Sequence, residues 1–323
     1  MDAYCPHLGA NLGVMGRVVG DCIECPFHGW RFRGEDGVCT HVPYASKGVI
    51  FILQTWSCTR LLQIQRFVAF LPPPAFVKAK TWISKEVYGL LLAWYHADGE
   101  KPTWDVNEPD EITSGRWRRT ALYEKQIHGI MQDIAENGAD VNHFSHVHKA
   151  SAFAGPKEYQ RFASTSWLRR AMTFEFDVKW SEHDFKVLVS MDNRVKIFGW
   201  TALSTHTDLW QLGPALTVAQ TTSSFGNLFY VISLTPRGPL DISTVIQTYD
   251  GRSLFWPIRR LMESATSTIV DQDTLIWDHK TFLKNPGLVK EDSAIKTFRE
   301  WYAQFYSSKS LTWRDVKEKT LLW

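Results

Sequence analysis

Apolar and polar residues alternate most clearly in the second half of the chain, where the pattern predicts β-strands. Residues 173–180 carry an aromatic or aliphatic side chain at every second position, which is typical of a strand with one buried face. Similar strand-like segments follow at residues 187–191, 217–222 and 228–234. This region is therefore expected to form a sheet.

Three segments have helical periodicity: residues 129–147, 256–279 and 293–305. In the first, Ile130, Ile134, Val141 and Phe144 are spaced for one face of a helix. Strands followed by a long helix indicate an α+β domain, in which an antiparallel sheet wraps round a helix.

The N-terminal part has a different pattern. The first 45 residues contain many glycines and few helical periods, so they predict turns and short strands. Residues 82–95 predict a hairpin with its turn near Glu86 and Gly89. A charged loop follows, and we place the boundary near Asp105. Residues 1–105 and 106–323 are thus the predicted domains.

Composition narrows the function classes. The chain has 323 residues, which is enough for two domains. Its net charge of +2 is too small to indicate a nucleic-acid-binding protein. Five cysteines are too few for a disulfide framework and favour a reducing compartment. The most apolar stretch, residues 48–76, is interrupted by Arg60 and Arg66 and closed by three prolines. We therefore expect no transmembrane helix.

Two loops near the start each offer one thiol and one imidazole. Cys5 and His7 lie in a C-P-H loop, and Cys25 and His28 lie in a C-P-F-H-G-W loop. A Rieske [2Fe–2S] cluster needs this division, because two cysteines hold one iron and two histidines hold the other. A zinc site is the alternative, but zinc sites more often group like ligands. Cys22 is a rival ligand that would leave His28 without a role.

A second metal site is predicted at residues 136–148. Two histidines and one carboxylate hold the iron of non-haem Fe(II) oxygenases, and His143 and His148 are the predicted histidine ligands. Five residues apart on an ideal helix, they would point about 140° apart. The helix is therefore expected to kink or end between them. The pair His143 and His146 is the alternative for a regular helix.

The remaining partners of this site are acidic. Asp140 lies about one helical turn before His143, where its carboxylate could hydrogen-bond a ligand imidazole and fix its tautomer. The third ligand must come from elsewhere, and Asp271, Asp273 and Asp278 compete for it. Spacing alone does not rank these three.

These motifs resemble those of Rieske-type non-haem iron oxygenases. The similarity includes the two cysteine–histidine loops, the E-N-x-x-D-x-x-H-x-x-x-x-H run at residues 136–148, and D-x-x-I-W at residues 273–277. Residues 78–82, 94–99 and 301–306 further resemble the animal cholesterol 7-desaturases of the Neverland type. The resemblance points to Asp273 as the carboxylate ligand and assigns catalytic roles to Asp140 and Asn137.

The resemblance also implies an architecture and a reaction. It implies a β-rich Rieske domain, a helix-grip catalytic domain, and a homotrimer in which Asp140 bridges the cluster of one subunit and the iron of the next. The implied reaction converts cholesterol to 7-dehydrocholesterol with O₂ and electrons from NAD(P)H. A separate reductase would supply them, because no G-x-G-x-x-G loop follows a strand. Location at the endoplasmic reticulum, facing the cytosol, is implied as well.

The chain departs from the family pattern in two places. Cys5 lies almost at the terminus, so the Rieske domain is expected to be truncated and an N-terminal anchor to be missing. Residues 48–73 read as an insert without clear periodicity, for which a translated intron is our hypothesis. Alternative functions are hydroxylation of another steroid or apolar substrate, a non-catalytic electron-transfer protein, or an inactive fragment.

Overall fold

The computed structural model describes residues 1–45, 48–53, 64–69, 77–148, 172–238, 240–251, 254–310 and 312. Its contacts divide the chain into two compact units. The first contains Met1–Glu86 and Leu91–Tyr95, and the second contains Val87–Leu90 and His96–Trp323. The division therefore passes through a hairpin, about ten residues before the predicted boundary at Asp105.

The first unit is built from short strands, as the sequence predicts. A four-stranded antiparallel sheet contains β1 (Arg17–Val19), β2 (Cys22–Glu24), β3 (Arg31–Arg33) and β4 (Cys39–His41). Phe32 is fully buried at its centre and packs with Cys5, Cys25 and Leu12. The two loop cysteines are thus part of the small hydrophobic core.

Two separate hairpins complete the description of this region. One pairs β7 (Ser84–Val87) with β8 (Leu90–Ala93), and confirms the hairpin predicted at residues 82–95. Its turn is Tyr88-Gly89, both with positive φ, as a two-residue hairpin turn requires. The other pairs β5 (Gly48–Leu53) with β6 (Ile64–Ala69) inside the predicted insert. The rest of the insert at residues 48–73 lies outside the described residues.

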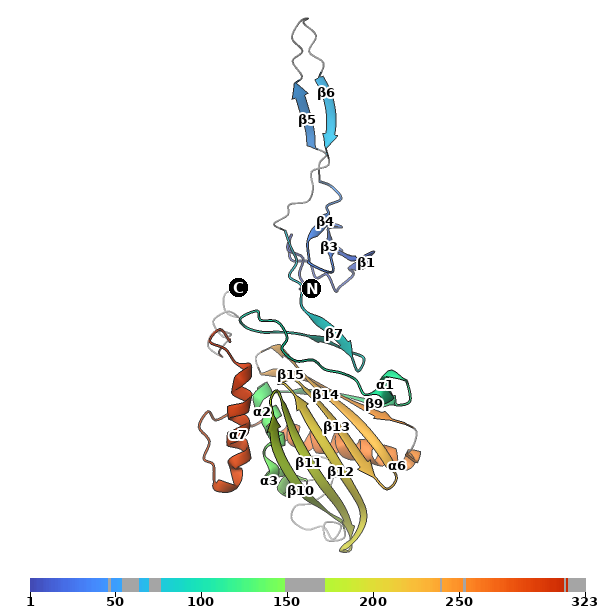
Figure 1. The fold of residues 1–323 in the computed structure, drawn as a ribbon, viewed down its shortest axis with the longest axis vertical. Helices are drawn as coiled ribbons and strands as arrows, with labels where there is room; N and C mark the ends of the chain where they lie inside the picture. Colours follow the sequence, from blue (N-terminus) through green and yellow to red (C-terminus); the bar gives the residue numbers. More distant parts are fainter. Residues whose placement is uncertain are drawn as a thin grey trace, which may run out of the picture. The chain divides into compact units, whose positions relative to one another are not determined.

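The second unit contains a seven-stranded antiparallel sheet (Figure 1). Its order is β10-β11-β12-β13-β14-β15-β9. The strands are β9 (Arg118–Ile127), β10 (Met172–His183), β11 (Lys186–Ile197), β12 (Trp200–Leu212), β13 (Leu216–Ser223), β14 (Gly226–Gly238) and β15 (Asp241–Asp250). All the strands expected from alternation are present, and each is longer than predicted.

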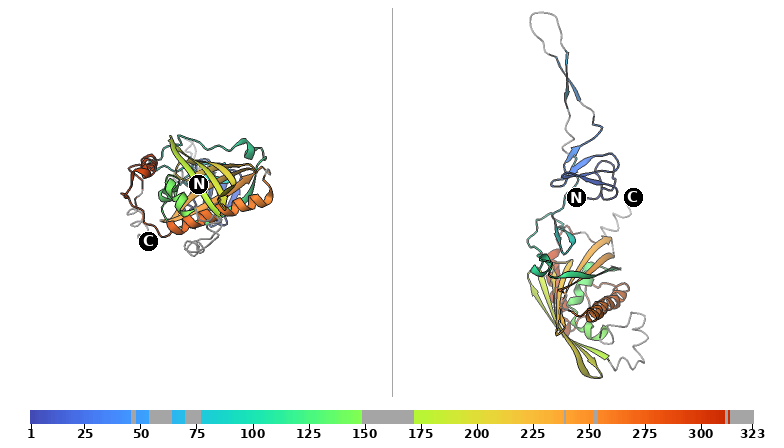
Figure 2. Two further views of the ribbon diagram at one scale, coloured as in Figure 1. Left: turned by 90° about the horizontal axis from the view of Figure 1, so that it is seen from below. Right: turned by 90° about the vertical axis from the view of Figure 1, so that its right-hand side faces the viewer.

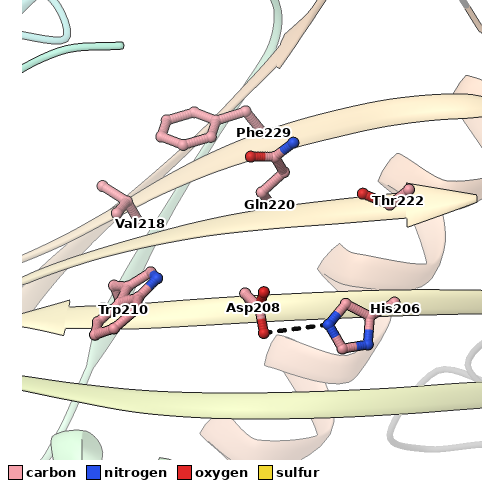
Figure 3. Close-up of a pocket in the computed structure, with 7 residues that line it drawn as sticks. All are labelled: His206, Asp208, Trp210, Val218, Gln220, Thr222 and Phe229. Carbon is pink, nitrogen blue, oxygen red and sulfur yellow. Dashed lines mark ion pairs between the residues drawn. The ribbon is translucent and has the colours of Figure 1, made fainter.

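Alternation gives the sheet two distinct faces. On the inner face, Val187 and Val189 of β11 are buried and pack with Phe298 and Trp301. Leu209 of β12 also points inward, toward Ile258. Neighbouring residues of the same strands point outward, because side chains alternate along a strand. Figure 3 shows part of the outer face of β12, β13 and β14.

The inner face is covered by helices, as expected for a sheet wrapped round a helix (Figure 2). The long helix α6 (Trp256–Trp277) lies across it and begins with Pro257 in its first turn. The last predicted helix is confirmed as α7 (Ser293–Tyr302), extended by η3 (Ala303–Phe305). Two short elements, α1 (Asp110–Thr113) and η2 (Lys290–Asp292), lie in connections.

The prediction of one continuous helix at residues 129–147 is wrong. The structure divides it into α2 (Met131–Ala135), η1 (Glu136–Gly138) and α3 (Val141–Val147). Asp140 leaves the helical conformation at φ −80° and ψ 74°, and its side chain accepts a hydrogen bond from the His143 amide. This N-cap starts a new helix, which changes the direction of the side chains that follow.

None of the helices in the described part of the chain is both long enough and apolar enough to cross a bilayer.

Candidate functional site: two metal centres

The first candidate centre is formed by two loops with the same backbone pattern. In each, the cysteine amide donates to the carbonyl five residues later, and a glycine amide donates back to the cysteine carbonyl. The bonds are 2.8 Å long in the Cys5 loop, and 2.8 and 3.0 Å in the Cys25 loop. Gly9 and Gly29 have φ of 75° and 69°, which favours glycine at the end of each loop.

The loops bring two thiols and two imidazoles together. Cys5 and Cys25 are 3% and 2% exposed, and the ring centroids of His7 and His28 lie 4.9 Å apart. Burial raises the pKa of the Cys5 thiol, and the Cys25 thiol beside it adds to the effect. Two buried thiolates beside one another would need positive charge, which metal ions supply.

The imidazoles also fit a metal centre. His7 Nδ1 is buried and lacks a hydrogen-bond partner among the described residues. Trp30 stacks on the His7 ring with centroids 4.3 Å apart and an angle of 8°, which fixes the plane of the ring. A buried ring nitrogen without a partner is costly unless it binds an ion. This donor set therefore fits a Rieske cluster.

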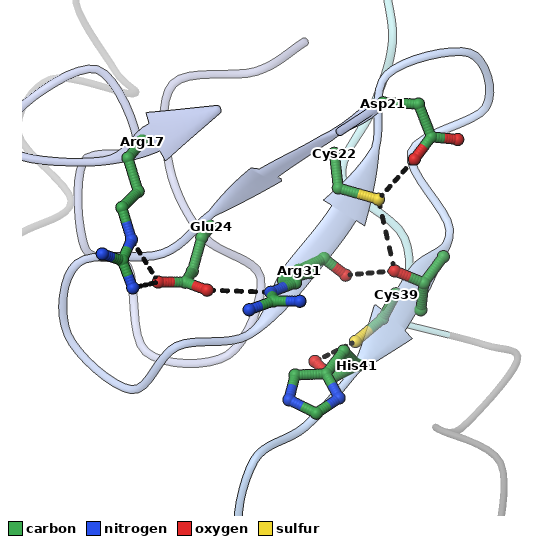
Figure 4. A network of polar contacts seen from close by, with 8 residues as sticks. Arg17, Asp21, Cys22, Glu24, Arg31, Cys39 and His41 are labelled. Atoms are coloured by element: carbon green, nitrogen blue, oxygen red, sulfur yellow. Dashed lines mark hydrogen bonds and ion pairs between the residues drawn. The ribbon is translucent and has the colours of Figure 1, made fainter. Parts of the chain in front are cut away.

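The rival ligand Cys22 is engaged elsewhere (Figure 4). Its Sγ donates to Asp21 Oδ1 at 3.2 Å and lies 3.4 Å from Thr40 Oγ1. Cys39, on β4, donates to the His41 carbonyl at 3.7 Å. Cys22 therefore contacts Asp21 and Thr40, and not the two histidines of the loops.

The second candidate centre joins residues far apart in sequence. His143 lies on α3, His148 is its C-cap residue, and Asp273 lies on α6. One ligand atom from each lies within 4.8 Å of the other two. The helix ends at Val147, as the five-residue spacing of the histidines requires. His148 and Asp273 are 0% and 6% exposed, so a bound ion would be shielded from water.

The competing ligands lie elsewhere. His146 is exposed on α3. Asp271 accepts hydrogen bonds from Tyr123 and Lys125, both at 2.6 Å, and Asp278 accepts from the His128 amide at 2.8 Å. Since two residues turn an α-helix by about 200°, Asp271 and Asp273 point to opposite sides of α6.

Two side-chain amides contact the predicted ligands. Asn137 Nδ2 lies 3.2 Å from both His143 Nε2 and Asp273 Oδ2, and therefore links α3 with α6. Gln272 Oε1 lies 2.9 Å from His148 Nδ1 and fixes that ring. The role of Gln272 was not foreseen, because nothing in the sequence distinguishes it from other helix residues.

Asp140 acts differently from the expectation. Its backbone carbonyl contacts His143 Nδ1, whereas its carboxylate caps the helix by accepting from the His143 amide at 3.3 Å. The expected contact between carboxylate and imidazole is thus replaced by one from the carbonyl. In either case Nδ1 is the donor, so Nε2 carries the lone pair that a metal would bind and that here faces Asn137 Nδ2 at 3.2 Å.

The electrostatics of the two histidines differ. Burial lowers the pKa of His143, although Asp273 partly opposes this. Burial acts in the same direction on His148, but the Asp273 carboxylate and Gln272 outweigh it and raise the pKa of that ring. His148 Nε2 lies 3.3 Å from Asp273 Oδ1, without hydrogen-bond geometry. A buried, unpartnered nitrogen beside a carboxylate suits a cation between them.

Aromatic residues border the inner side of this centre. The Phe176 ring centroid lies 6.5 Å from that of His148 and 6.0 Å from that of Phe144. Phe174 stacks on Phe176 with centroids 6.5 Å apart. These rings, both from β10, form an apolar wall beside the predicted ligands.

Other aromatic residues of the sheet lie away from the predicted ligands. Trp210 and Phe229 line a pocket of about 250 Å³ on the outer face, together with the ion pair His206–Asp208 at 3.2 Å (Figure 3). Trp200 is 82% exposed at the end of β12, and Tyr230 contacts Thr266 of α6. The outer pocket is separated from the metal-ligand group by the sheet itself.

An ion pair fastens the ligand segment to the C-terminal helix. Arg299 on α7 binds both carboxylate oxygens of Glu136, with Nη2 to Oε1 at 2.8 Å. Glu136 directly precedes Asn137 and is only 6% exposed. This bidentate pair ties η1, which carries Asn137, to α7.

Comparison with known protein families agrees with both centres. The sequence model of the Rieske [2Fe-2S] domain matches residues 1–61. The model of the 3-ketosteroid 9alpha-hydroxylase C-terminal domain matches residues 93–306, which is more than half of the chain. The chain belongs to the Rieske oxygenase family. Membership implies a Rieske cluster and a mononuclear iron.

Several members of the family with assigned activities are similar over almost the whole chain. "Cholesterol 7-desaturase nvd" of Xenopus laevis is 34% identical over 96% of this chain and 64% of its own length. The Drosophila melanogaster protein of the same name is 33% identical over 98% and 68%. The oxygenase component of a Rhodococcus rhodochrous 3-ketosteroid-9-alpha-monooxygenase is 26% identical over 95% and 73%. The chain thus spans about two thirds of the length of these desaturases.

The fold is shared with solved Rieske oxygenase structures. Dicamba monooxygenase bound to dicamba superposes with a TM-score of 0.60 at 13% identity, covering 94% of this chain and 84% of that chain. At this identity the likeness concerns the fold alone. It confirms the predicted order of a Rieske domain followed by a sheet-rich catalytic domain.

Proposed function

We propose that the chain is a Rieske oxygenase that desaturates a sterol, converting cholesterol to 7-dehydrocholesterol. The observation that carries the proposal is the convergence of His143, His148 and Asp273 within 4.8 Å. Two imidazoles and one carboxylate are the donor set of non-haem Fe(II) oxygenases. The sterol is suggested by the names of the desaturases that are 33–34% identical.

The proposal assigns the ligands as follows. Cys5 and Cys25 would hold one iron of the cluster, and His7 and His28 the other. His143, His148 and Asp273 would hold the mononuclear iron. When bound, these groups deliver single electrons and activate O₂, which removes hydrogens that no side-chain base could abstract from a sterol.

The surrounding residues would position the ligands. The Asp140 carbonyl would accept a hydrogen bond from His143 Nδ1, and Gln272 Oε1 would accept one from His148 Nδ1. The Nε2 atom of each ring would then be available to the metal beside Asp273. Asn137 would fix the position of Asp273 relative to His143, because it contacts both side chains. We therefore propose positioning roles for Asn137 and Asp140. The buried setting and the rings of Phe174 and Phe176 would exclude water and receive apolar rings.

Further parts of the proposal rest on the family. We propose residues 1–105 as the Rieske domain and residues 106–323 as the catalytic domain. A separate reductase would donate electrons. A homotrimer would allow Asp140 to bridge the cluster of one subunit and the iron of its neighbour. We also propose association with the endoplasmic reticulum membrane, because the substrate dissolves in membranes.

A single-turnover assay tests the function. The purified, iron-loaded chain is reduced with dithionite, mixed with cholesterol and exposed to air. We expect 7-dehydrocholesterol, detected by its conjugated-diene absorption and by mass spectrometry. Dithionite removes the need for the reductase. If the sterol is recovered unchanged while both iron centres are present, the proposal is wrong.

A second candidate is hydroxylation of a ketosteroid. The observation that favours it is the match of residues 93–306 to the 3-ketosteroid 9alpha-hydroxylase domain. The same single-turnover assay with a 3-ketosteroid separates the two, because hydroxylation adds an oxygen atom to the product whereas desaturation removes two hydrogens.

A non-catalytic electron-transfer protein or an inactive fragment is distinguished by metal content. An oxygenase should hold about three iron atoms per chain, two in the cluster and one mononuclear. An electron carrier should hold about two, and zinc in the N-terminal loops would exclude both readings.

A further inference from the structure

One half-buried polar side chain on the inner face of the sheet has a hydrogen-bonding atom that is buried and unused. Asn193 lies on β11, and its Nδ2 donates to Thr205 Oγ1 of β12 at 3.3 Å. Its Oδ1 is buried and accepts no hydrogen bond within the described part of the chain. Leaving such an acceptor without a partner costs free energy, so it calls for a donor beyond the described residues.

Register places Asn193 close to the metal-ligand group. It is paired directly with Phe176 of β10, and directly opposite residues have Cβ atoms about 5 Å apart on the same face. The Phe176 ring lies beside His148, with centroids 6.5 Å apart. Asn193 is therefore separated from the predicted iron site by one aromatic ring, on the face that carries the apolar wall.

The other polar groups of this face are either paired or offer no acceptor near the metal-ligand group. Trp180 Nε1 on β10 lacks a partner among the described residues, but it is a donor and cannot accept from a hydroxyl. In the next row of the inner face, Thr207 and Thr221 are each 7% exposed and bond one another at 2.9 Å. Thr244 Oγ1 also lacks a partner among the described residues, but it lies on β15, four strands away from Asn193. Among the described residues of the inner face, Asn193 thus combines an unused acceptor with nearness to the metal-ligand group.

We propose that Asn193 Oδ1 accepts a hydrogen bond from the sterol hydroxyl, and that it thereby determines substrate specificity. This inference rests on the proposed function and extends it. A sterol is a hydrocarbon with one hydroxyl group, on the ring next to the one that is desaturated. An acceptor oxygen selects a hydroxyl, which can donate, over a ketone, which cannot. Asn193 therefore favours a hydroxysterol over a 3-ketosteroid.

The strength of this selection follows from burial. A site that hydrogen-bonds a substrate hydroxyl rejects an analogue without it, because the buried polar group is then left unpaired. For one neutral hydrogen bond we expect a preference of about 10- to 100-fold. The apolar remainder of the sterol would bind equally in both cases, so the preference should depend on the side chain at position 193.

Internal competition tests the inference. A mixture of cholesterol and cholest-5-ene, which lacks the hydroxyl, is offered to the dithionite-reduced chain, and the two products are quantified by mass spectrometry. The natural chain should prefer cholesterol at least about tenfold. Asn193→Leu should reduce this ratio to near one, whereas Asn193→Asp, which keeps acceptor oxygens, should retain most of it. Quenching of tryptophan fluorescence gives both sterol affinities without turnover.

Thr244→Val is the matched control, since it also removes a buried hydrogen-bonding group from the inner face. It should leave the cholesterol preference unchanged. The inference is overturned if the natural chain does not discriminate, if Asn193→Leu keeps the preference, or if Thr244→Val abolishes it equally. Absence of product from both sterols would instead count against the proposed function, while the binding ratio would still decide the role of Asn193.

Discussion

The two candidate metal centres are built in opposite ways. The cluster loops place all four ligands between Cys5 and His28, on two turns with the same hydrogen bonds. The mononuclear centre combines α3 with α6, and His148 lies 125 residues before Asp273. One centre is determined by local backbone geometry and the other by packing of the second unit. They should therefore fail independently when they are perturbed.

The largest expected effect tests this independence. His143→Ala removes a predicted ligand of the mononuclear iron, so turnover should fall by well over the roughly 100-fold that follows loss of an outer partner. The absorption and EPR spectra of the cluster should be unchanged. Cys25→Ser should abolish both the cluster spectrum and turnover, because the electron source is lost. Retained turnover in His143→Ala would disprove the second centre.

The same contrast explains what could be predicted from sequence. The candidate ligands Cys5, His7, Cys25 and His28 can be picked out from the sequence because they form compact motifs. The end of α3 before His148 followed from helix geometry alone. In contrast, spacing could not choose between Asp271 and Asp273, because the choice depends on which side of α6 faces α3. Resemblance to a family supplied that choice.

Missed elements have a similar cause. The strand β12 was not predicted, since its apolar residues lie at its two ends and the middle is a polar run of serine, threonine, histidine and aspartate, and neighbouring strands stabilise it. The break at Asp140 was missed because apolar periodicity continues through it. Gln272 and Asn193 matter only through contacts between distant segments, at 124 residues for Gln272 and His148. Local pattern carries no information on such contacts.

The next effect concerns Asn137, which connects the two halves of the mononuclear centre. Asn137→Ala removes its contacts with His143 and Asp273, and we expect a loss of about 10- to 100-fold in iron affinity or turnover. Asn142→Ala, at an exposed position of α3, is the control and should have little effect. Iron affinity is measured by titration of the apo-chain. Equal affinity of both variants would mean that Asn137 does not orient the ligands.

The free energy of unfolding should depend more on a buried ion pair between distant segments than on an exposed pair within one helix. Glu136→Gln breaks the buried pair with Arg299, 163 residues away, and should lower the free energy of unfolding by about 3 kcal/mol. Glu300→Gln removes an exposed partner of Lys296 at 3.9 Å, which should cost less than about 0.5 kcal/mol. Urea denaturation followed by circular dichroism measures both. Similar midpoints would show that the Glu136 pair contributes little.

The smallest expected effect is a difference in stability between variants of the two cluster loops. Their backbones are alike, but their surroundings differ. Gly9 and Gly29 both have positive φ, so alanine should cost about 1 kcal/mol at either position. A Cβ at Gly29 would lie 2.9 Å from Pro43 Cγ, whereas a Cβ at Gly9 would meet nothing within 4 Å. Gly29→Ala should therefore bleach the cluster at lower urea concentration than Gly9→Ala, because Pro43 must also move. The reverse order would mean that the loop backbone, and not its contact with Pro43, limits cluster stability.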